Sequence, residues 1–94
     1  MSKRDDSSKE APLLEFPCAF PIKMMGRQST TFSTTAIEIV ERHTGPLDAS
    51  AVRTAPSSKG NFTSVTVTIE ARSQRQLDDI YRDLTSHDEI LVAL

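Results

Sequence analysis

The sequence predicts an α+β domain of the ferredoxin-like type, in which two helices cover one face of a four-stranded antiparallel sheet. Three observations lead to this prediction. Apolar residues alternate with polar ones in the segments predicted as strands, and they recur every three or four positions in the segments predicted as helices. The length of 94 residues allows one domain. The predicted order is strand 19–25, helix 31–43, strands 49–55 and 62–71, helix 74–85 and strand 90–94.

The first strand is predicted at residues 19–25, where the apolar residues Phe20, Ile22 and Met24 alternate with their neighbours. Gly26 is expected to end this strand. Because Pro21 has no N–H to donate to a sheet, its nitrogen is expected to face away from the neighbouring strand.

The first helix is predicted at residues 31–43, with Ser29 or Thr30 as its N-cap and Gly45-Pro46 as its stop signal. Successive helical residues turn by about 100°, so Ile37 lies about 140° from the apolar stripe that begins at Phe32. Ile37 is therefore a candidate exposed apolar residue. The stripe consists of Phe32, Ala36, Ile39, Val40 and His43.

The middle of the chain is predicted to form a β-hairpin with one buried and one exposed face. Residues 49–55 indicate a weak strand with small side chains, and residues 56–61 are rich in turn-forming types. Residues 62–71 give the clearest strand in the sequence. Its buried face is predicted to carry Val65, Val67, Ile69 and Ala71, and its exposed face Phe62, Ser64, Thr66, Thr68 and Glu70.

The second helix is predicted at residues 74–85, where Ser73 and Gln76 have the spacing of a capping box. Asp78 and Arg82 have the spacing of an ion pair on one side of this helix. The apolar stripe consists of Leu77, Ile80, Tyr81 and Leu84. Residues 87–89 turn the chain into a short final strand.

Composition excludes several classes of protein. Residues 1–12 are charged and rich in serine, so they are predicted to form a disordered tail before a single domain at residues 13–94. The net charge of −2 argues against nucleic-acid binding by phosphate neutralisation and against a polybasic membrane-surface protein. The first residues contain no apolar run of signal-peptide length, and no stretch approaches the roughly 20 apolar residues of a membrane span, so the protein is expected to stay where it is made. The single cysteine, Cys18, points to the reducing cytoplasm.

Two segments resemble a known family. Residues 14–26 read LEFPCAFPIKMMG, and residues 56–65 read PSSKGNFTSV. The first resembles the L-E-F-P-x-x-F-x-x-K-x-M-G opening of the YbeD-like family of small bacterial proteins. The second resembles the P-S-S-K-G-N-[FY]-x-S-V hairpin of the same family, and it is the more specific of the two. The resemblance covers roughly residues 13–94 and includes Gln76, Tyr81 and Leu84.

The resemblance implies a fold similar to the ACT domain, a ferredoxin-like module that often senses amino acids in regulated enzymes. Members of the YbeD-like family are often encoded near the machinery that attaches lipoyl groups to proteins. Neither association names an activity, because a fold does not determine a function. A link to lipoate metabolism is nevertheless an expectation that the resemblance supplies.

The first candidate site is the connection between the first strand and the first helix. A glycine permits close approach of a ligand, the free N–H groups of a helix start attract anions, and an arginine adds positive charge. In ACT-like domains this loop commonly lines the effector site. An ordinary strand-to-helix turn would explain the same residues. The candidate ligand-binding residues are Gly26, Arg27, Gln28, Ser29 and Thr30.

The second candidate site is the tip of the hairpin, which is predicted to contact a partner. Functional residues gather on loops that protrude from a rigid scaffold. Turn chemistry, with Gly60 or Asn61 at positive φ, explains part of the motif and leaves Ser57, Ser58 and Lys59 without a local reason. The candidate contact residues are Ser57, Ser58, Lys59, Gly60, Asn61 and Phe62.

No catalytic residue, metal site or cofactor is predicted. Cys18 has no basic neighbour within two positions and is expected to be a structural thiol. His43 is expected to pack near the end of the first helix, and residues 87–89 have poor spacing for metal ligands. The aspartates of the second helix lie on its polar face, where solvated charge is normal.

The leading hypothesis is a non-catalytic binding or regulatory module that acts through a small ligand or a protein partner, as a monomer or a homodimer. A small hydrolase of the acylphosphatase type shares the predicted fold, and Arg27 and Asn61 superficially suit it. However, the G-x-V-Q-G-V-x-F-R run of that family is absent. An RNA-binding plait needs aromatic residues and basic charge on its sheet, and the exposed face of residues 62–71 offers one aromatic and no basic residue.

Overall fold

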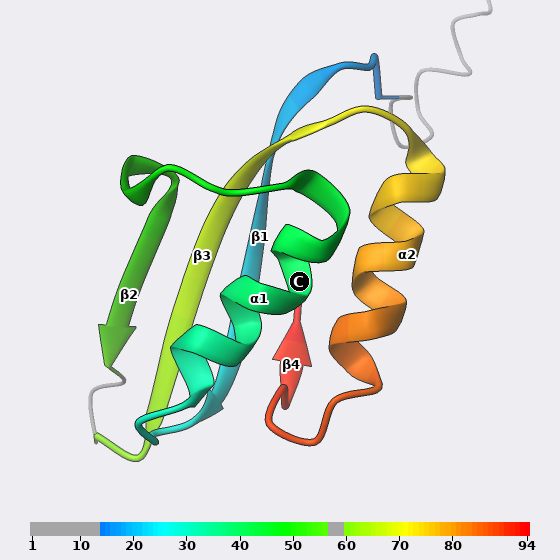
Figure 1. Cartoon of the computed structure of the whole chain (residues 1–94). Helices are drawn as coiled ribbons and strands as arrows, with labels where there is room; N and C mark the ends of the chain where they lie inside the picture. The colour runs from blue at the N-terminus through cyan, green and yellow to red at the C-terminus, as the bar shows by residue number, and fades with distance from the viewer. Residues whose placement is uncertain (1–13, 57–59) are drawn as a thin grey trace, which may run out of the picture.

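The computed structural model of the chain describes residues 14–56 and 60–94. It has a four-stranded antiparallel sheet in the order β2-β3-β1-β4, with α1 and α2 on one face (Figure 1). The predicted ferredoxin-like fold is therefore confirmed. In chain order the elements are β1 (Cys18–Arg27), α1 (Phe32–Thr44), the 3₁₀ turn η2 (Ala49–Ala51), β2 (Val52–Pro56), β3 (Phe62–Ala71), α2 (Gln74–Thr85) and β4 (Val92–Ala93).

The central strand β1 is longer than the sequence predicts, whereas its partner β3 has the predicted bounds. Pairing runs from Cys18 opposite Ala71 to Arg27 opposite Phe62. Gly26 therefore does not end the strand, and the prediction that it does is wrong. A Cβ atom at Gly26 would lie 2.4 Å from the Glu89 carbonyl oxygen and 2.4 Å from the Phe32 ring. Glycine is needed within β1 because two neighbouring segments pack directly on its backbone.

Pro21 lies in β1 with its nitrogen toward the side of the sheet where β4 ends. The Lys23 N–H donates to the Leu94 carbonyl oxygen at 3.1 Å, and the Leu94 N–H donates to the Lys23 carbonyl oxygen at 2.8 Å. Backbone groups two positions apart in a strand point the same way, so Pro21 also faces that side. This agrees with the prediction that its nitrogen faces away from β3.

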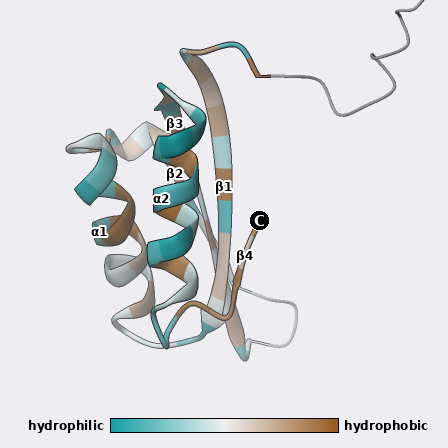
Figure 2. Ribbon diagram, turned by 90° about the vertical axis from the view of Figure 1, so that its right-hand side faces the viewer, coloured by the Kyte–Doolittle hydropathy of each residue, from teal (hydrophilic) through white to brown (hydrophobic). Residues whose placement is uncertain are grey.

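The core lies between the sheet and the two helices. Figure 2 shows the helices with their apolar residues turned toward the sheet. Ile37 was expected to be exposed, but it is half-buried and packs against the core. The buried apolar residues include Ile22, Met24, Phe32, Ile39, Val65, Val67, Ile69, Leu77, Ile80 and Leu84.

Polar side chains join the two helices. The Gln76 Nε2 group donates to the His43 carbonyl oxygen at 3.0 Å, and the Arg72 N–H donates to Gln76 Oε1 at 2.7 Å. The Ser73 hydroxyl accepts from the Gln76 N–H at 3.0 Å, which confirms the predicted cap. His43 Nε2 lies 2.6 Å from Asp83 Oδ2. Gln76 therefore fastens the end of α1 to the start of α2.

One predicted ion pair is replaced by another. Arg82 pairs with Asp79 at 3.0 Å, and not with Asp78 as its spacing suggested. Asp78 instead accepts from the Gln74 side chain at 3.1 Å. Both arrangements use neighbours on one side of the helix, so the local spacing alone does not choose between them.

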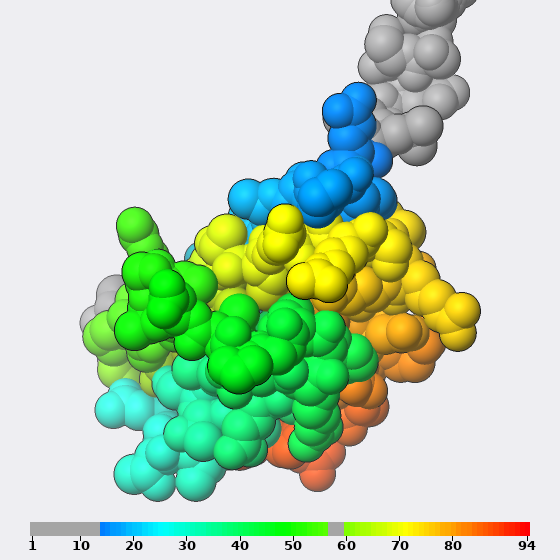
Figure 3. All heavy atoms as spheres, turned by 45° about the horizontal axis from the view of Figure 1, so that its top comes forward, coloured from blue at the N-terminus to red at the C-terminus, as the bar shows by residue number. Residues whose placement is uncertain are grey.

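Two strands are shorter than predicted. Residues 49–51 form the 3₁₀ turn rather than the start of β2, and β4 is confined to Val92–Ala93. The chain before β4 is irregular because Ile90 is buried in the core while the Leu91 N–H donates to the Met25 carbonyl oxygen at 2.8 Å. Figure 3 shows the start of β1, in blue, beside the residues that join β3 to α2, in yellow.

The predicted tail at residues 1–12 lies outside the described residues, as do residues 57–59 of the hairpin. Within residues 14–56 and 60–94, neither helix is long and apolar enough to cross a membrane.

Candidate functional site

Three segments that are distant in the sequence meet at one end of the sheet, at the bottom of Figure 1. They are the end of β1 with the loop to α1, the start of β3, and the loop between α2 and β4. The Gln28 N–H donates to the Asn61 carbonyl oxygen at 3.0 Å. The first candidate site, 26–30, and the described part of the second, 60–62, are therefore neighbours at the same end of the molecule.

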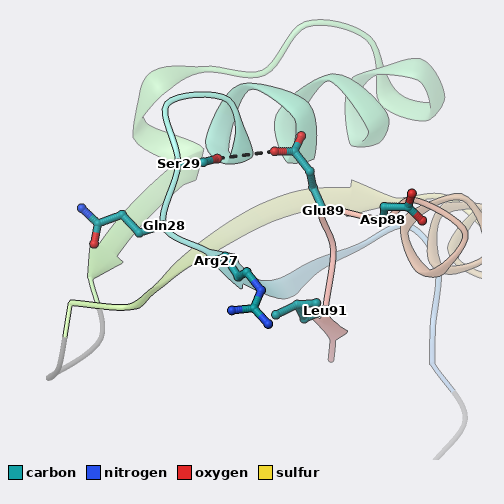
Figure 4. A pocket seen from close by; sticks show the side chains of 6 residues that line it. All are labelled: Arg27, Gln28, Ser29, Asp88, Glu89 and Leu91. Atoms are coloured by element: carbon teal, nitrogen blue, oxygen red, sulfur yellow. Dashed lines mark hydrogen bonds between the residues drawn. The ribbon is translucent and has the colours of Figure 1, made fainter.

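A pocket of about 370 Å³ opens between the first of these segments and the α2–β4 loop. In Figure 4 the Arg27 side chain points toward Leu91, Glu89 points toward Ser29, and Gln28 points away from both pairs. The pocket therefore combines a cation, carboxylates and an apolar side chain. Its lining residues are Arg27, Gln28, Ser29, Asp88, Glu89 and Leu91.

The Glu89 carboxylate sits among hydroxyl groups at the start of α1. One oxygen accepts from the Thr31 hydroxyl at 2.7 Å and from the Ser29 hydroxyl at 3.4 Å. The other oxygen accepts from the Thr35 hydroxyl at 2.9 Å. The hydrogen bonds from Thr31 and Thr35 lower the pKa of Glu89 below its ordinary value, because they favour the charged form.

Ser29 caps the start of α1 from two positions before the N-cap residue, Thr31. Its hydroxyl oxygen accepts from the Phe32 N–H at 3.0 Å and from the Thr31 N–H at 3.3 Å. The negative charge that a helix start favours is supplied by Glu89 of the same chain. A ligand in the pocket would therefore meet the Arg27 side chain and not a vacant helix terminus.

The structure separates the residues of the first candidate site. Gly26 is buried inside β1, and Arg27 is the last residue of that strand. Gln28 and Ser29 line the pocket, whereas Thr30 is exposed in the loop and is not part of the lining. The role of Gly26 is to let Phe32 and the α2–β4 loop approach β1.

The second candidate site is partly described. Gly60 is exposed and has a φ of +72°, which confirms the prediction of a positive φ at this turn. Asn61 is exposed and Phe62 is half-buried. Ser57, Ser58 and Lys59 lie outside the described residues.

Sequence reasoning missed Asp88, Glu89 and Leu91, which it treated as a turn and a strand. A signal was available in the predicted topology. In a β-α-β-β-α-β plait the last strand runs antiparallel to the first, so the loop before it reaches the end of the sheet where the first strand ends. The carboxylate of Glu89 could have been assigned to the start of α1 on that ground.

The described residues offer little for metal or nucleophilic chemistry. Within residues 14–56 and 60–94, no group of three or more His, Cys, Asp or Glu side chains could hold a metal ion. His87 accepts from the Glu89 N–H through Nδ1 at 3.1 Å, which shapes the α2–β4 loop. Cys18 is free and half-buried at the opposite end of β1.

Comparison of structures supports the fold. The solution structure of protein HP0495 from H. pylori is similar to this chain with a TM-score of 0.71 and 19% sequence identity, and the match covers 94% of this chain and 92% of that one. At this level of identity the likeness shows the fold alone.

Comparison of sequences shows the family. A UPF0250 protein from Paraburkholderia phytofirmans is 50% identical over 88 residues, which are 94% of this chain and 99% of the relative. A UPF0250 protein from Neisseria gonorrhoeae is 44% identical over 89 residues, which are 95% of this chain and 98% of the relative. These relatives confirm the resemblance to the YbeD-like proteins. The model of the family described as "Protein of unknown function (DUF493)" matches residues 11–94, and the chain belongs to that family.

Proposed function

We propose that this chain is a binding or regulatory module without catalysis of its own, which acts in the cytoplasm and takes a small ligand in the pocket between Arg27 and Leu91. The observation that carries the proposal is a pocket between two loops, the β1–α1 loop and the α2–β4 loop, at one end of a rigid sheet. Binding sites are commonly concave and built from loops on such a scaffold.

The lining defines the chemistry of the ligand. Arg27 is exposed at the end of β1, and it is the basic side chain among the lining residues. Leu91 is 50% exposed and supplies an apolar wall. An arginine beside an apolar wall suits a small molecule that carries an anionic group on an apolar body. Because the YbeD-like family is associated with lipoyl attachment, lipoyl compounds and amino acids are the first ligands to test.

The arrangement of Ser29 favours binding over catalysis. A serine nucleophile needs a hydroxyl that is free to attack and a base that removes its proton. The Ser29 oxygen instead accepts from two backbone N–H groups, and the carboxylate beside it has a lowered pKa, which makes it a poor base. The hydroxyls and Glu89 therefore serve to hold the loop in place.

A thermal-shift screen of cytosolic metabolites tests the proposal. A ligand present at about a hundred times its Kd stabilises a protein by about 2.7 kcal/mol. For a domain of this size, that raises the melting temperature by roughly 10–20 °C. Arg27→Gln is expected to weaken binding by about tenfold or more, since a charge-assisted hydrogen bond contributes about 1.5–3 kcal/mol. Arg75→Gln, an exposed position on α2, is the matched control and is expected to leave affinity unchanged.

A screen in which no metabolite raises the melting temperature would refute the small-ligand proposal. The second candidate is a protein partner that contacts the hairpin, which is favoured by the exposure of Gly60 and Asn61. A partner whose affinity is insensitive to Arg27→Gln and sensitive to Asn61→Ala would support that alternative.

A further inference from the structure

The face of the sheet opposite the helices carries an organised set of side chains. Figure 2 shows both helices on one side of the sheet. The strand register places the residues of this open face in rows. Lys23, Thr66 and Arg53 form one row, and Met25, Ser64 and Ala55 form the next.

Positive charge is concentrated on this open face. Lys23, Arg27 and Arg53 are exposed there. Lys23 and Arg53 lie opposite Thr66, and Arg27 lies opposite Phe62. Thr66 and Phe62 belong to the face of β3 that points away from the buried residues Val65, Val67 and Ile69. Neither ion pair of the described residues, His43–Asp83 and Arg82–Asp79, involves these cations. The carboxylate on this face, Glu70, lies opposite Ala19 at the other end of the β1–β3 pair.

The charge of the open face contrasts with the rest of the molecule. The chain has a net charge of −2. The helices on the other side carry more carboxylates, at Glu38, Glu41, Asp78, Asp79 and Asp83, than cations, at Arg42, Arg75 and Arg82. Three cations on one face of an acidic protein give it a polarity that would orient an acidic partner during encounter.

An apolar strip borders these cations. Val92 lies opposite Met25 in the sheet, and Leu94 exchanges backbone hydrogen bonds with Lys23. Val92 is 41% exposed and Leu94 is 67% exposed. The lower half of the open face therefore offers a neutral centre of Met25, Ser64 and Thr66 with cations around it and exposed apolar side chains at its edge.

From this arrangement we propose that the open face docks an acidic segment of a partner protein, with carboxylates at Lys23, Arg27 and Arg53 and apolar side chains against Met25, Val92 and Leu94. Strands lie about 4.8 Å apart, so Lys23 and Arg53 are separated by about 10 Å across the sheet. Lys23 and Arg27 are four residues apart, about 13 Å along the strand. Cations with this spacing match carboxylates distributed along a polypeptide.

The centre of this face argues against nucleic acid as the occupant. Single-stranded nucleic acid is bound by stacking bases on aromatic residues in the middle strands of a sheet. The corresponding positions here are Met25, Ser64 and Thr66, and the aromatic residue of the face, Phe62, lies at its end. The floor therefore suits the side chains of a protein better than bases.

Selection from a library of short random peptides displayed on phage tests the proposal without presupposing a sequence. Peptides selected on the full chain are expected to be rich in Asp and Glu with interspersed apolar residues. Their affinity, measured by fluorescence anisotropy at physiological salt, is expected to fall about tenfold or more for the variant with Lys23→Glu and Arg53→Glu. The matched control with Arg42→Glu and Arg75→Glu, two exposed helix positions, is expected to change affinity by less than about twofold.

The same assay defines the results that would overturn the proposal. The proposal is wrong if the selection enriches no peptides or only peptides without acidic residues. It is also wrong if the Lys23→Glu/Arg53→Glu variant binds the peptides with the affinity of the original protein, or if the protein binds oligothymidine or phosphatidylglycerol vesicles more tightly than the peptides. Circular dichroism of both double variants checks that they fold. Lys23 and Arg53 do not line the pocket of Arg27 and Leu91, so this result is independent of the small-ligand proposal.

Discussion

The substitution Gly26→Ala tests how closely the α2–β4 loop packs against β1. Replacing Gly26 with alanine would put a Cβ atom 2.4 Å from the Glu89 carbonyl oxygen and 2.4 Å from Cε1 of Phe32. The first neighbour is backbone, and the second is the ring of a residue that is 1% exposed. Neither can move away without shifting the α2–β4 loop or repacking the core.

The magnitude follows from the cost of overpacking. Adding a methyl group to a well-packed interior costs about 1–3 kcal/mol, and two contacts with such constrained neighbours place Gly26→Ala near the upper end. A loss of about 3 kcal/mol is a large part of the roughly 5–10 kcal/mol expected for a domain of this size. The corresponding drop in melting temperature is roughly 12–24 °C.

Urea unfolding monitored by circular dichroism measures this loss. Gly60→Ala is the control, because a Cβ atom there meets nothing within 4 Å while φ is +72°. Its cost is expected to be that of the backbone conformation, about 1–2 kcal/mol. Adding Phe32→Leu to Gly26→Ala should recover part of the loss, giving a favourable coupling energy in a double-mutant cycle. If the free energy of unfolding of Gly26→Ala lies within about 0.5 kcal/mol of that of the original protein, Gly26 is not closely packed against Glu89 and Phe32.

Three further predictions concern the caps, the core and the charge at Glu89. Ser73→Ala should lower the free energy of unfolding by about 0.5–2 kcal/mol in urea titrations, because the Gln76 N–H loses its acceptor; no change would contradict a role for this cap. Ile80→Ala should cost about 2–5 kcal/mol in the same assay, since Ile80 is fully buried against the sheet and α1, whereas a cost below about 1 kcal/mol would refute its place in the core. Glu89→Gln tests the lowered pKa of Glu89. A depressed carboxyl pKa stabilises the folded state above the ordinary value of 4.5, and this contribution is lost as the pH falls through the folded-state pKa. The urea midpoint of the original protein should therefore exceed that of Glu89→Gln at pH near 7, and the difference should shrink as the pH falls below 4.5; a constant difference would contradict the assignment.

Periodicity in the sequence was sufficient to predict the order of elements and most of the core. Residues 62–71 and 74–85 were located correctly because each carries a clear alternation or stripe and a recognisable boundary. The end of β1 was misplaced because Gly26 is usually a sign of a turn. Here it serves close packing with Phe32 and Glu89, which are distant in the sequence and not visible in a local pattern.

Only one side of the candidate site was predicted, because the other side comes from a segment that is distant in the sequence. Arg27, Gln28 and Ser29 were singled out from the properties of a helix start, and they do line the pocket. Asp88, Glu89 and Leu91 belong to the opposite wall and were missed, because the contact between Glu89 and Thr31 joins residues far apart in the chain. The proximity of residues 60–62 to the β1–α1 loop could be known only from the register of β1 and β3, which places Arg27 opposite Phe62.

Two-dimensional amide NMR of the labelled protein with pooled cytosolic metabolites, amino acids and lipoyl compounds included, tests whether the pocket between Arg27 and Leu91 binds a small ligand. One compound is expected to shift the signals of Arg27, Gln28 and Ser29 together with those of Asp88, Glu89 and Leu91, in a saturable manner that Arg27→Gln weakens and Arg75→Gln does not. Pools that leave these six signals unchanged, or shifts scattered over α1 and α2 instead, would contradict it.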